Sequence, residues 1–455
     1  MQERKVLTEL QINDRLLWPV LETASWWWPA VTVAALVLGC GVTAVTIMVT
    51  LGEGTTGLNR PIFWGFMIVN FVFWVGISHA GVMISSILRL CQAEWRRPVT
   101  RAAEVLTVCS LATAALFPLI HMGRVWRFYW VFPYDFDRML WPDVRSPLIW
   151  DPSAIFTYLT GATMFVFMAL LPDLGILRDR TTGWRRTFYA FASLGWRGNP
   201  RQFKLQFILG ILLSGLILPV FVSVHSIVSW DFAVSLVPAW HATVFAPYFV
   251  IGAVHSGVSG VVTMMVVLRA AFKWQDYITP DHFDALGRLL VAVATAWLYF
   301  FMLDLLFAIY GGETREVGVM EQRIFQWPWG FFFFLIIVLG YIIPVSAWMF
   351  RSVRRNIMWM FAISIMVNVS MWLERLWLII PGLQNKERLT FDWAVFQPSL
   401  IEIMLVFSSF GLVCLGLLMF SKFFPLIPVW EEKEGQLFRE EIKIGNRIVP
   451  AIVRE

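Results

Sequence analysis

Histidine and aspartate side chains stand at the edges of long apolar segments in this sequence. His121 closes one such segment, Asp151 precedes another, and Asp231 follows a third. Histidine and partly desolvated carboxyl groups can exchange protons near neutral pH, because their pKa values can lie in that range. Such groups can hydrogen-bond the two hydroxyl groups of a quinol and accept its protons as the electrons leave. The set therefore fits a site for quinol oxidation.

Further ionisable residues are expected at the same depth as these three. Counted from the same ends of the apolar segments, they are His225, Asp304, Glu374, Arg375 and Glu402. An ionisable side chain inside a bilayer costs a few kcal/mol, so each one needs a physical reason. A polar pocket between apolar and aromatic walls is one reason. Helix capping and snorkelling to the interface are the alternative.

Two histidines lie deeper within apolar segments. His79 and His255 are flanked by glycine and serine residues, which let helices approach closely. One interpretation is a proton path through the membrane, to which Asp304 and Glu374 would add carboxyl groups. A haem held by two histidines is a second interpretation, although no apolar segment carries a pair of histidines. A histidine that is simply hydrogen-bonded to a neighbouring helix is the third.

The composition indicates where these side chains lie. Of the 455 residues, 58% are hydrophobic and 15% are charged, whereas soluble globular proteins are about 25% charged. Ten apolar segments are long enough to cross a hydrocarbon core of about 30 Å. They are 32–52, 61–90, 101–122, 153–177, 205–228, 240–269, 285–310, 328–350, 356–380 and 397–421. The sequence therefore predicts an all-α membrane protein with about ten transmembrane helices.

The loop charges predict an orientation. Lys and Arg concentrate in the loops after the even-numbered segments, above all in residues 178–204. By the positive-inside rule, both termini are then cytoplasmic, in a multi-pass protein of the bacterial inner membrane. The loops on the other side are rich in Trp, Pro and Asp, which favours a surface that docks other subunits. The net charge of +5 follows from the basic loops, and we expect no nucleic-acid partner.

One internal repeat is visible in the sequence. Residues 64–82 and 240–258 align without gaps, and His79 matches His255. An even number of segments separates the copies, so both run the same way through the bilayer. The predicted organisation is an N-terminal cytoplasmic or interfacial segment (1–31), a peripheral transmembrane helix (32–52), two four-helix bundles (61–228 and 240–380), a last transmembrane helix (397–421) and a cytoplasmic tail (422–455).

Several kinds of cofactor site have no motif in this sequence. The four cysteines, Cys40, Cys91, Cys109 and Cys414, are scattered and form no CxxC or CxxCH motif. The chain therefore offers neither a cysteine ligand set for an iron–sulfur cluster nor an attachment site for a covalent haem. No zinc motif and no phosphate-binding loop stands out. We expect no metal ligands in this chain.

Several longer motifs resemble those of a known membrane family. They are "NFVFWVGISHAGVMISSILRL", "AEWRRPVTRAAE", "LFPLIHMGRVW", "WPDVRSPLIWD", "LGWRGNPRQF" and "VSVHSIVSWDFAVSLVPAWHATVFAPYFV". Together they are similar to the NrfD/polysulfide reductase-type family of integral membrane quinol subunits, over most of residues 30–420. Within that family, they most resemble the large membrane C-subunits of bacterial alternative complex III.

The resemblance implies a quinol-oxidising subunit of a respiratory or photosynthetic electron-transfer complex. It implies a quinol site near the periplasmic face, with menaquinol or a similar quinol as substrate. Electrons would pass to a periplasmic iron–sulfur subunit and on to multihaem cytochrome c subunits, beside a paralogous membrane subunit and small membrane subunits. The iron–sulfur clusters and haems would lie in those partners, and the reaction could be coupled to proton translocation.

The resemblance also assigns site residues. In the family, the quinol site is associated with the histidine of "LIHMGR" and the aspartates of "LIWDP" and "SWDFA", which match His121, Asp151 and Asp231. This chain departs from the family just after the histidine, where Val125 stands in place of a frequent proline. No proline ring fixes the backbone there, so other residues must set the path of the loop.

Four more residues are expected around the quinol. Arg124 would orient Asp151 or stabilise negative charge on the quinone, and the aromatic walls would be Trp126, Tyr129 and Trp150. Two alternatives stay open. The chain could be a paralogous NrfD-like membrane anchor of a polysulfide- or nitrite-reductase-type enzyme. It could also be a secondary transporter, because parallel repeats and intramembrane histidines occur in that class too.

Overall fold

The computed structural model describes residues 8–131, 146–240, 242–384, 395–437, 441–444 and 447–450. Ten helical segments in these ranges are long and apolar enough to cross a membrane, which confirms the predicted all-α membrane fold. They are α2 (Trp27–Leu51), α3 (Phe66–Leu90), α4 (Arg97–His121), α5 (Pro147–Arg180), α7 (Pro200–Ala233), α8 (Phe245–Ala271), α9 (Pro280–Gly311), the segment α11–η5–α12 (Trp329–Ile337, Val338–Ile342 and Ile343–Trp348), α14 (Ile357–Gln384) and α15 (Leu400–Phe423).

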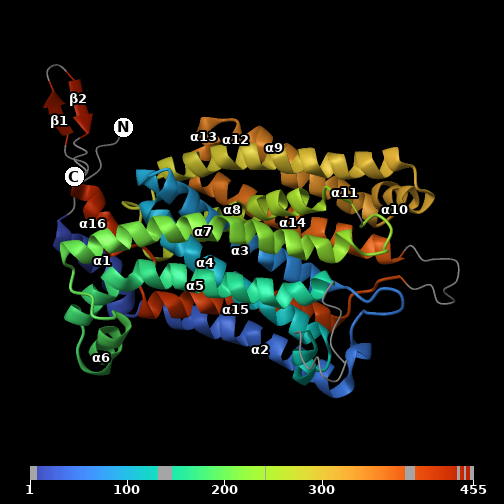
Figure 1. Ribbon diagram of the computed structural model, residues 1–455, viewed down its shortest axis with the longest axis horizontal. Helices are drawn as coiled ribbons and strands as arrows, with labels where there is room; N and C mark the ends of the chain where they lie inside the picture. The colour runs from blue at the N-terminus through green and yellow to red at the C-terminus, as the bar shows by residue number, and fades with distance from the viewer. Residues whose placement is uncertain are drawn as a thin grey trace.

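Shorter elements connect and flank these spans. They are α1 (Glu9–Leu21), η1 (Glu53–Thr55), η2 (Glu94–Arg96), η3 (Val125–Val131), α6 (Gly183–Ala192), α10 (Thr314–Phe325), α13 (Arg351–Arg354), α16 (Val429–Leu437) and the hairpin of β1 (Glu441–Ile444) and β2 (Arg447–Pro450). Helices α1, α6 and α16 lie at one end of the long axis, which we call the terminal end, and α10 lies at the other, the α10 end (Figure 1). Successive spans alternate in direction between these two ends.

Helix α3 runs through the centre of the helix array. Its most apolar stretch is wholly buried, and it packs against α4, α7, α8 and α14. Small residues permit the close crossing of α3 and α8. A Cβ on Gly257 would collide with the Cβ of Ala80, and one on Gly76 would lie 3.3 Å from Ser256 Oγ. Close backbone approach through small residues is the usual way in which membrane helices pack.

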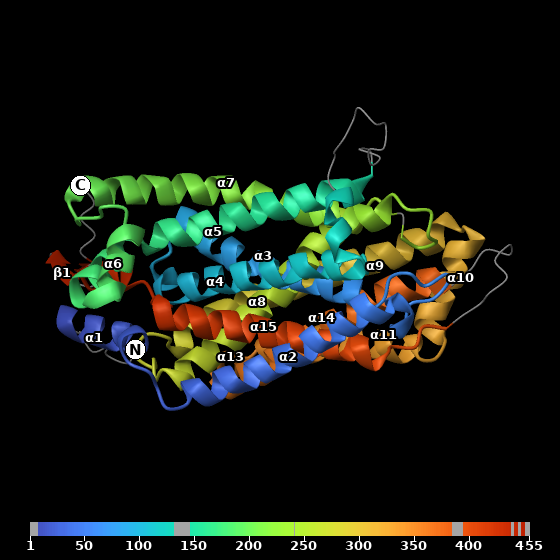
Figure 2. The ribbon, with the colours of Figure 1, turned by 90° about the horizontal axis from the view of Figure 1, so that it is seen from below.

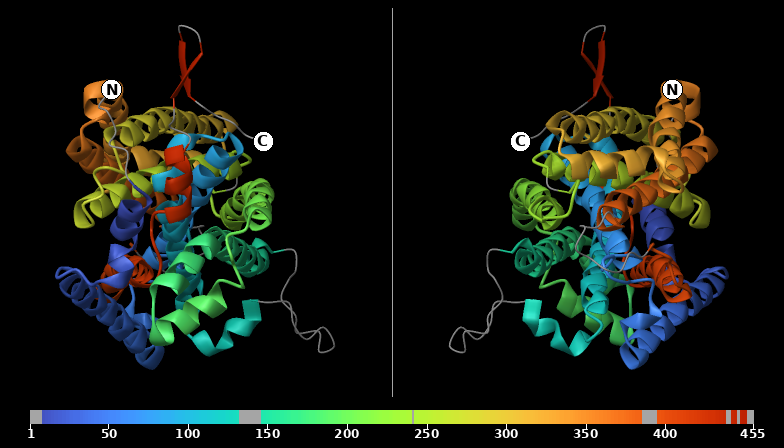
Figure 3. Two further views of the ribbon diagram at one scale, coloured as in Figure 1. Left: turned by 90° about the vertical axis from the view of Figure 1, so that its left-hand side faces the viewer. Right: turned by 90° about the vertical axis from the view of Figure 1, so that its right-hand side faces the viewer.

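The two halves of the predicted repeat show similar helix neighbours. Helix α3 packs on α4 and α7, and its predicted counterpart α8 packs on α9 and α14. Helices α2 and α15 pack on each other and lie side by side along the edge of the array (Figure 2, Figure 3). The two four-helix bundles and their parallel repeat stay predictions, because pairwise packing alone does not establish their relation.

The eighth span is interrupted by the π-helical turn η5. Its Gly340 lies so close to α14 that a Cβ there would meet Ser370 Oγ at 2.5 Å. Ser370 donates a hydrogen bond of 2.9 Å to the carbonyl oxygen of Ile336. A neighbouring helix thus satisfies a backbone group beside the irregular turn, as a membrane interior requires.

Helix α16 docks into a cluster of arginines at the terminal end. Glu431 is 1% exposed; its carboxylate accepts hydrogen bonds from Arg96 at 2.7 Å and from Arg89 at 3.4 Å. The backbone amides of Val429 and Trp430 donate to Asp173 of α5 at 3.3 and 3.1 Å. The tail expected over 422–455 therefore begins with a buried helix that is tied to α3, α4 and α5.

Candidate functional site

The carboxyl groups of Asp151 and Asp231 meet between α5 and α7. Both residues are buried, at 7% and 9% exposure, and their side chains hydrogen-bond each other. Oδ1 of each is buried and has no hydrogen-bond partner among the described residues. A hydrogen bond between two carboxyl groups requires that one of them carry a proton. The pair can therefore hold one proton and accept a second.

The same two helices place a tryptophan beside each aspartate. Trp150 and Trp230 contact each other edge to face, with ring centroids 6.3 Å apart. Both are 39% exposed. The dipeptide Trp-Asp thus occurs once on α5 and once on α7, with its aspartates paired inside the protein and its indole rings paired at the surface.

His121 ends α4 at the same end of the molecule as the aspartate pair. Its Nδ1 is buried and has no hydrogen-bond partner in the described part of the chain. The chain then turns at Gly123, where φ is +63°, and continues into η3. A left-handed glycine, rather than the missing proline, therefore shapes this bend. Helix α4 packs against α5, which carries Asp151.

The expected aromatic walls lie at the protein surface. Trp126 is 57% exposed and Tyr129 is 45% exposed, and Arg124 is exposed as well. These residues stand where α4 leaves the apolar region, at the α10 end. In this structure they form an aromatic rim rather than the lining of a closed pocket.

His79 lies in the middle of α3 and touches a second histidine. Its ring centroid is 4.6 Å from that of His225 on α7. His79 Nδ1 is 2.5 Å from the carbonyl oxygen of Val75, and Nε2 is 2.9 Å from that of Phe221. A neutral ring can donate to only one of these oxygens, whereas a protonated ring donates to both. Tyr158 of α5 also packs on the His79 ring, at 5.1 Å.

A second buried polar cluster lies between α8, α9, α10 and α14. The hydroxyl of Tyr248 donates to the carboxylate of Glu374, and Arg375 Nε lies 3.3 Å from the same carboxylate. Asp304 on α9 is buried within electrostatic range of Glu374 and Arg323. Burial lowers the pKa of Arg323, which lies outside the spans, although nearby Asp304 opposes that shift.

His225 connects the two polar regions. Its ring lies 5.9 Å from the ring of Phe249 on α8, and the guanidinium carbon of Arg375 lies 4.3 Å from the same phenylalanine ring. Neither nitrogen of His225 makes a hydrogen bond of good geometry within the described ranges. Close neighbours in space therefore connect α3 with α14, in the order His79, His225, Phe249, Arg375 and Glu374.

The predicted residues thus fall into distinct places. Asp151 and Asp231 are brought together, and Asp304 and Glu374 share one cluster. His79 and His255, which the repeat aligns, have different surroundings: His255 packs on Trp297 at 5.6 Å and has neither ring nitrogen hydrogen-bonded among the described residues. Within those residues, no group of three His, Cys, Asp or Glu side chains gathers as a metal site.

Sequence reasoning missed three groups that the structure places near these residues. Tyr158 and Tyr248 lie inside apolar runs, where a tyrosine gives no signal of its polar contacts. Arg323 lies in a segment that was expected to be a loop docking other subunits, and no pattern showed that it would be buried in a helix, α10. The repeated Trp-Asp dipeptide was a usable signal for the α5–α7 pairing.

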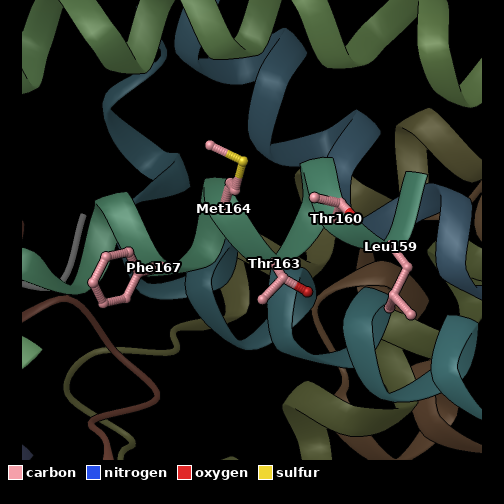
Figure 4. A pocket seen from close by; sticks show the side chains of 5 residues that line it. All are labelled: Leu159, Thr160, Thr163, Met164 and Phe167. Carbon is pink, nitrogen blue, oxygen red and sulfur yellow. The ribbon is translucent and has the colours of Figure 1, made fainter. Parts of the chain in front are cut away.

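A shallow groove of about 330 Å³ lies on another face of α5. Its lining residues are Leu159, Thr160, Thr163, Met164 and Phe167 (Figure 4). None of the residues expected at the quinol site lines this groove. The candidate site is therefore the set of buried acid–base groups near the α10 end.

The fold and this set define a class: a multi-pass helical membrane protein with acid–base groups buried toward one end. Residues 54–385 match the family described as "Polysulphide reductase, NrfD". This match covers well over half of the chain, so the chain belongs to the NrfD family, as the sequence motifs predicted.

Two curated relatives are similar to this chain. One, from Halobacterium salinarum, is provisionally described as the membrane C-subunit of a dimethyl sulfoxide reductase; it is 25% identical over 367 residues, which cover 79% of this chain and 77% of the relative. The other is the C-subunit of the selenate reductase of Mesobacillus selenatarsenatis, 22% identical over 427 residues, which cover 89% of this chain and 94% of the relative.

Proposed function

We propose that this chain is a quinol-oxidising membrane subunit of an electron-transfer complex, with menaquinol as the substrate. The observation that carries the proposal is the buried, hydrogen-bonded pair of Asp151 and Asp231 near the end of α4 that bears His121. Membership of the NrfD family and its oxidoreductase relatives support a redox role within a complex.

Different site residues would accept the two protons of the quinol. Oxidation of a quinol to a quinone releases two protons and two electrons. The aspartate pair already shares one proton and can take one more, and His121 can take the other. Electrons would leave to an iron–sulfur cluster of a partner subunit. Trp126, Tyr129 and Trp150 would flank the quinone at the aromatic rim.

Two complexes fit this role. The long motifs around His121 and Asp231 favour the C-subunit of alternative complex III, with periplasmic iron–sulfur and multihaem cytochrome c partners. The two curated relatives favour a membrane anchor of a terminal reductase. In both, the α10 end would face the periplasm and bind the partner, and both termini would be cytoplasmic in a bacterial inner membrane. The basic residues near the terminal end support that orientation.

The His121→Ala variant tests the quinol site. We expect quinol:acceptor turnover of the purified complex to fall by about 100-fold, because one of the two proton acceptors is lost. The matched control is His282→Gln. His282 holds the third position of the α9 capping box, where glutamine is a favoured residue, so the helix start is retained. Wild-type turnover in an assembled His121→Ala complex would contradict the proposal.

We also propose a proton path that uses His79, His255, Asp304 and Glu374. The contact of His79 with His225, and the placement of Asp304 within electrostatic range of Glu374, support such a path. In proteoliposomes, we expect His79→Gln to lower the number of protons released per electron, because the ring that bridges two carbonyl oxygens is lost. An unchanged ratio would remove His79 from the path.

A further inference from the structure

The loop between α2 and α3 reaches the turn that follows His121. A Cβ built on Gly123 would lie 2.8 Å from Oε1 of Glu53 and 2.9 Å from its Cγ and Cδ. Gly123 also has a backbone φ of +63°, a value that residues other than glycine rarely adopt. The turn at Gly123, two residues after His121, therefore leaves room for the Glu53 carboxyl group.

A buried glutamate holds this loop in position. Glu402, at the start of α15, accepts hydrogen bonds from the amides of Gly57 at 2.9 Å and Phe66 at 3.3 Å. It also accepts the amide of Ser399 at 3.2 Å, which closes the capping box of α15. The carbonyl oxygen of Glu53 accepts the amide of Thr56 at 2.9 Å. Both ends of the loop are thus fixed, and Glu53 is carried to a defined place.

Glu53, which lies against Gly123, and His121, two residues before Gly123, each have an unsatisfied polar atom. Oε1 of Glu53 and Nδ1 of His121 are buried, and neither has a hydrogen-bond partner among the described residues. Burial raises the pKa of the Glu53 carboxyl group above its ordinary value. Unpartnered buried polar atoms are destabilising, so two of them at one turn call for an explanation beyond packing. The other charged group on this turn, Arg124, is exposed.

We propose that Glu53 is the proton acceptor for His121, the group through which the proton taken from the quinol leaves the site. This inference rests on the proposed quinol-oxidising function. The protonated imidazole of His121 gives its proton to the Glu53 carboxylate, which returns the ring to its neutral form. The carboxyl group then releases the proton to water at the α10 end. No electrons move in this step.

The test compares Glu53→Gln, Glu53→Ala and His121→Ala in the assembled complex. Glutamine keeps the size and packing of glutamate against Gly123 but cannot accept the proton. We expect Glu53→Gln to lower kcat about tenfold, with the KM for quinol unchanged, because the quinol itself does not contact Glu53. Added formate or acetate should restore turnover to Glu53→Ala, by supplying a carboxylate in the vacated space. Glu9→Gln is the matched control, because Glu9 is an exposed carboxylate on α1, at the terminal end, and this variant should behave as wild type.

The outcomes separate this inference from the function on which it rests. Normal turnover in Glu53→Gln, with slow turnover in His121→Ala, would overturn the role of Glu53 and leave the quinol site standing. Slow turnover in Glu53→Ala alone, without rescue by formate or acetate, would make Glu53 a packing residue and overturn the proposal too. Normal turnover in His121→Ala would remove the quinol role of His121 and the relay together.

Discussion

Replacing Asp151 with asparagine is expected to lower quinol:acceptor turnover by about 100- to 1,000-fold, and Asp231→Asn should have a similar effect. Asparagine has nearly the size of aspartate and can keep a hydrogen bond to the remaining carboxyl group. It cannot accept a proton from the quinol. The aspartates share one hydrogen bond, so they should act as a unit. The double variant should therefore be little slower than either single variant.

Turnover should be measured with a soluble quinol and the natural acceptor of the complex. Assembly is checked first, because a carboxyl group in the apolar region could also hold α5 and α7 together. Asp179→Asn is the matched control, since Asp179 lies near the other end of α5 and its side chain is 67% exposed. Two slow single variants whose effects multiply in the double variant would show independent sites. Fast turnover in assembled single variants would exclude the pair from proton transfer.

The ten spans were predictable because hydropathy and length give a strong signal in a bilayer. The structure moves their ends: α2 begins at Trp27, where the sequence predicted residue 32, and α5 continues to Arg180. The short helices α1, α10 and α16 were not predicted. Each is partly polar, and its burial depends on which part of the bundle it meets. Local sequence carries little information about such docking.

The depth of the candidate-site residues along the spans was predictable from the sequence, but the contacts between them were not. The positions of Asp151 and Asp231 near the ends of two apolar segments placed both at one end of the molecule. Their hydrogen bond depends on how α5 and α7 are rotated about their axes, which spacing along one chain does not determine. His79 shows the same limit. The fold places it against His225, and nothing in the spacing of the sequence predicted that contact.

The second large effect is expected at the terminal end, where Glu431→Ala should destabilise the protein by about 3–5 kcal/mol. Burial alone would raise the pKa of Glu431, but the charges of the neighbouring arginines outweigh it and lower that pKa below its ordinary value of 4.5. The arginines in question are Arg96, Arg89, Arg97 and Arg101. Removing the carboxylate leaves these buried positive charges without their shared partner.

The helix α16 should then detach, and hydrogen exchange at the amides of Val429 and Trp430 should report it. Glu434→Ala is the matched control, because Glu434 pairs with Arg97 from a side chain that is 42% exposed. Such a partly exposed pair contributes about 1 kcal/mol or less.

Acid should have the same effect as Glu431→Ala in the wild-type protein. Because the folded-state pKa of Glu431 is the lower one, its contribution is complete above pH 4.5 and is lost as pH falls below that value. Protection of the Val429 and Trp430 amides should decline over that range in wild type and be absent throughout in Glu431→Ala. Equal protection in both proteins at neutral pH would show that Asp173 and the apolar contacts hold α16 without the ion pairs.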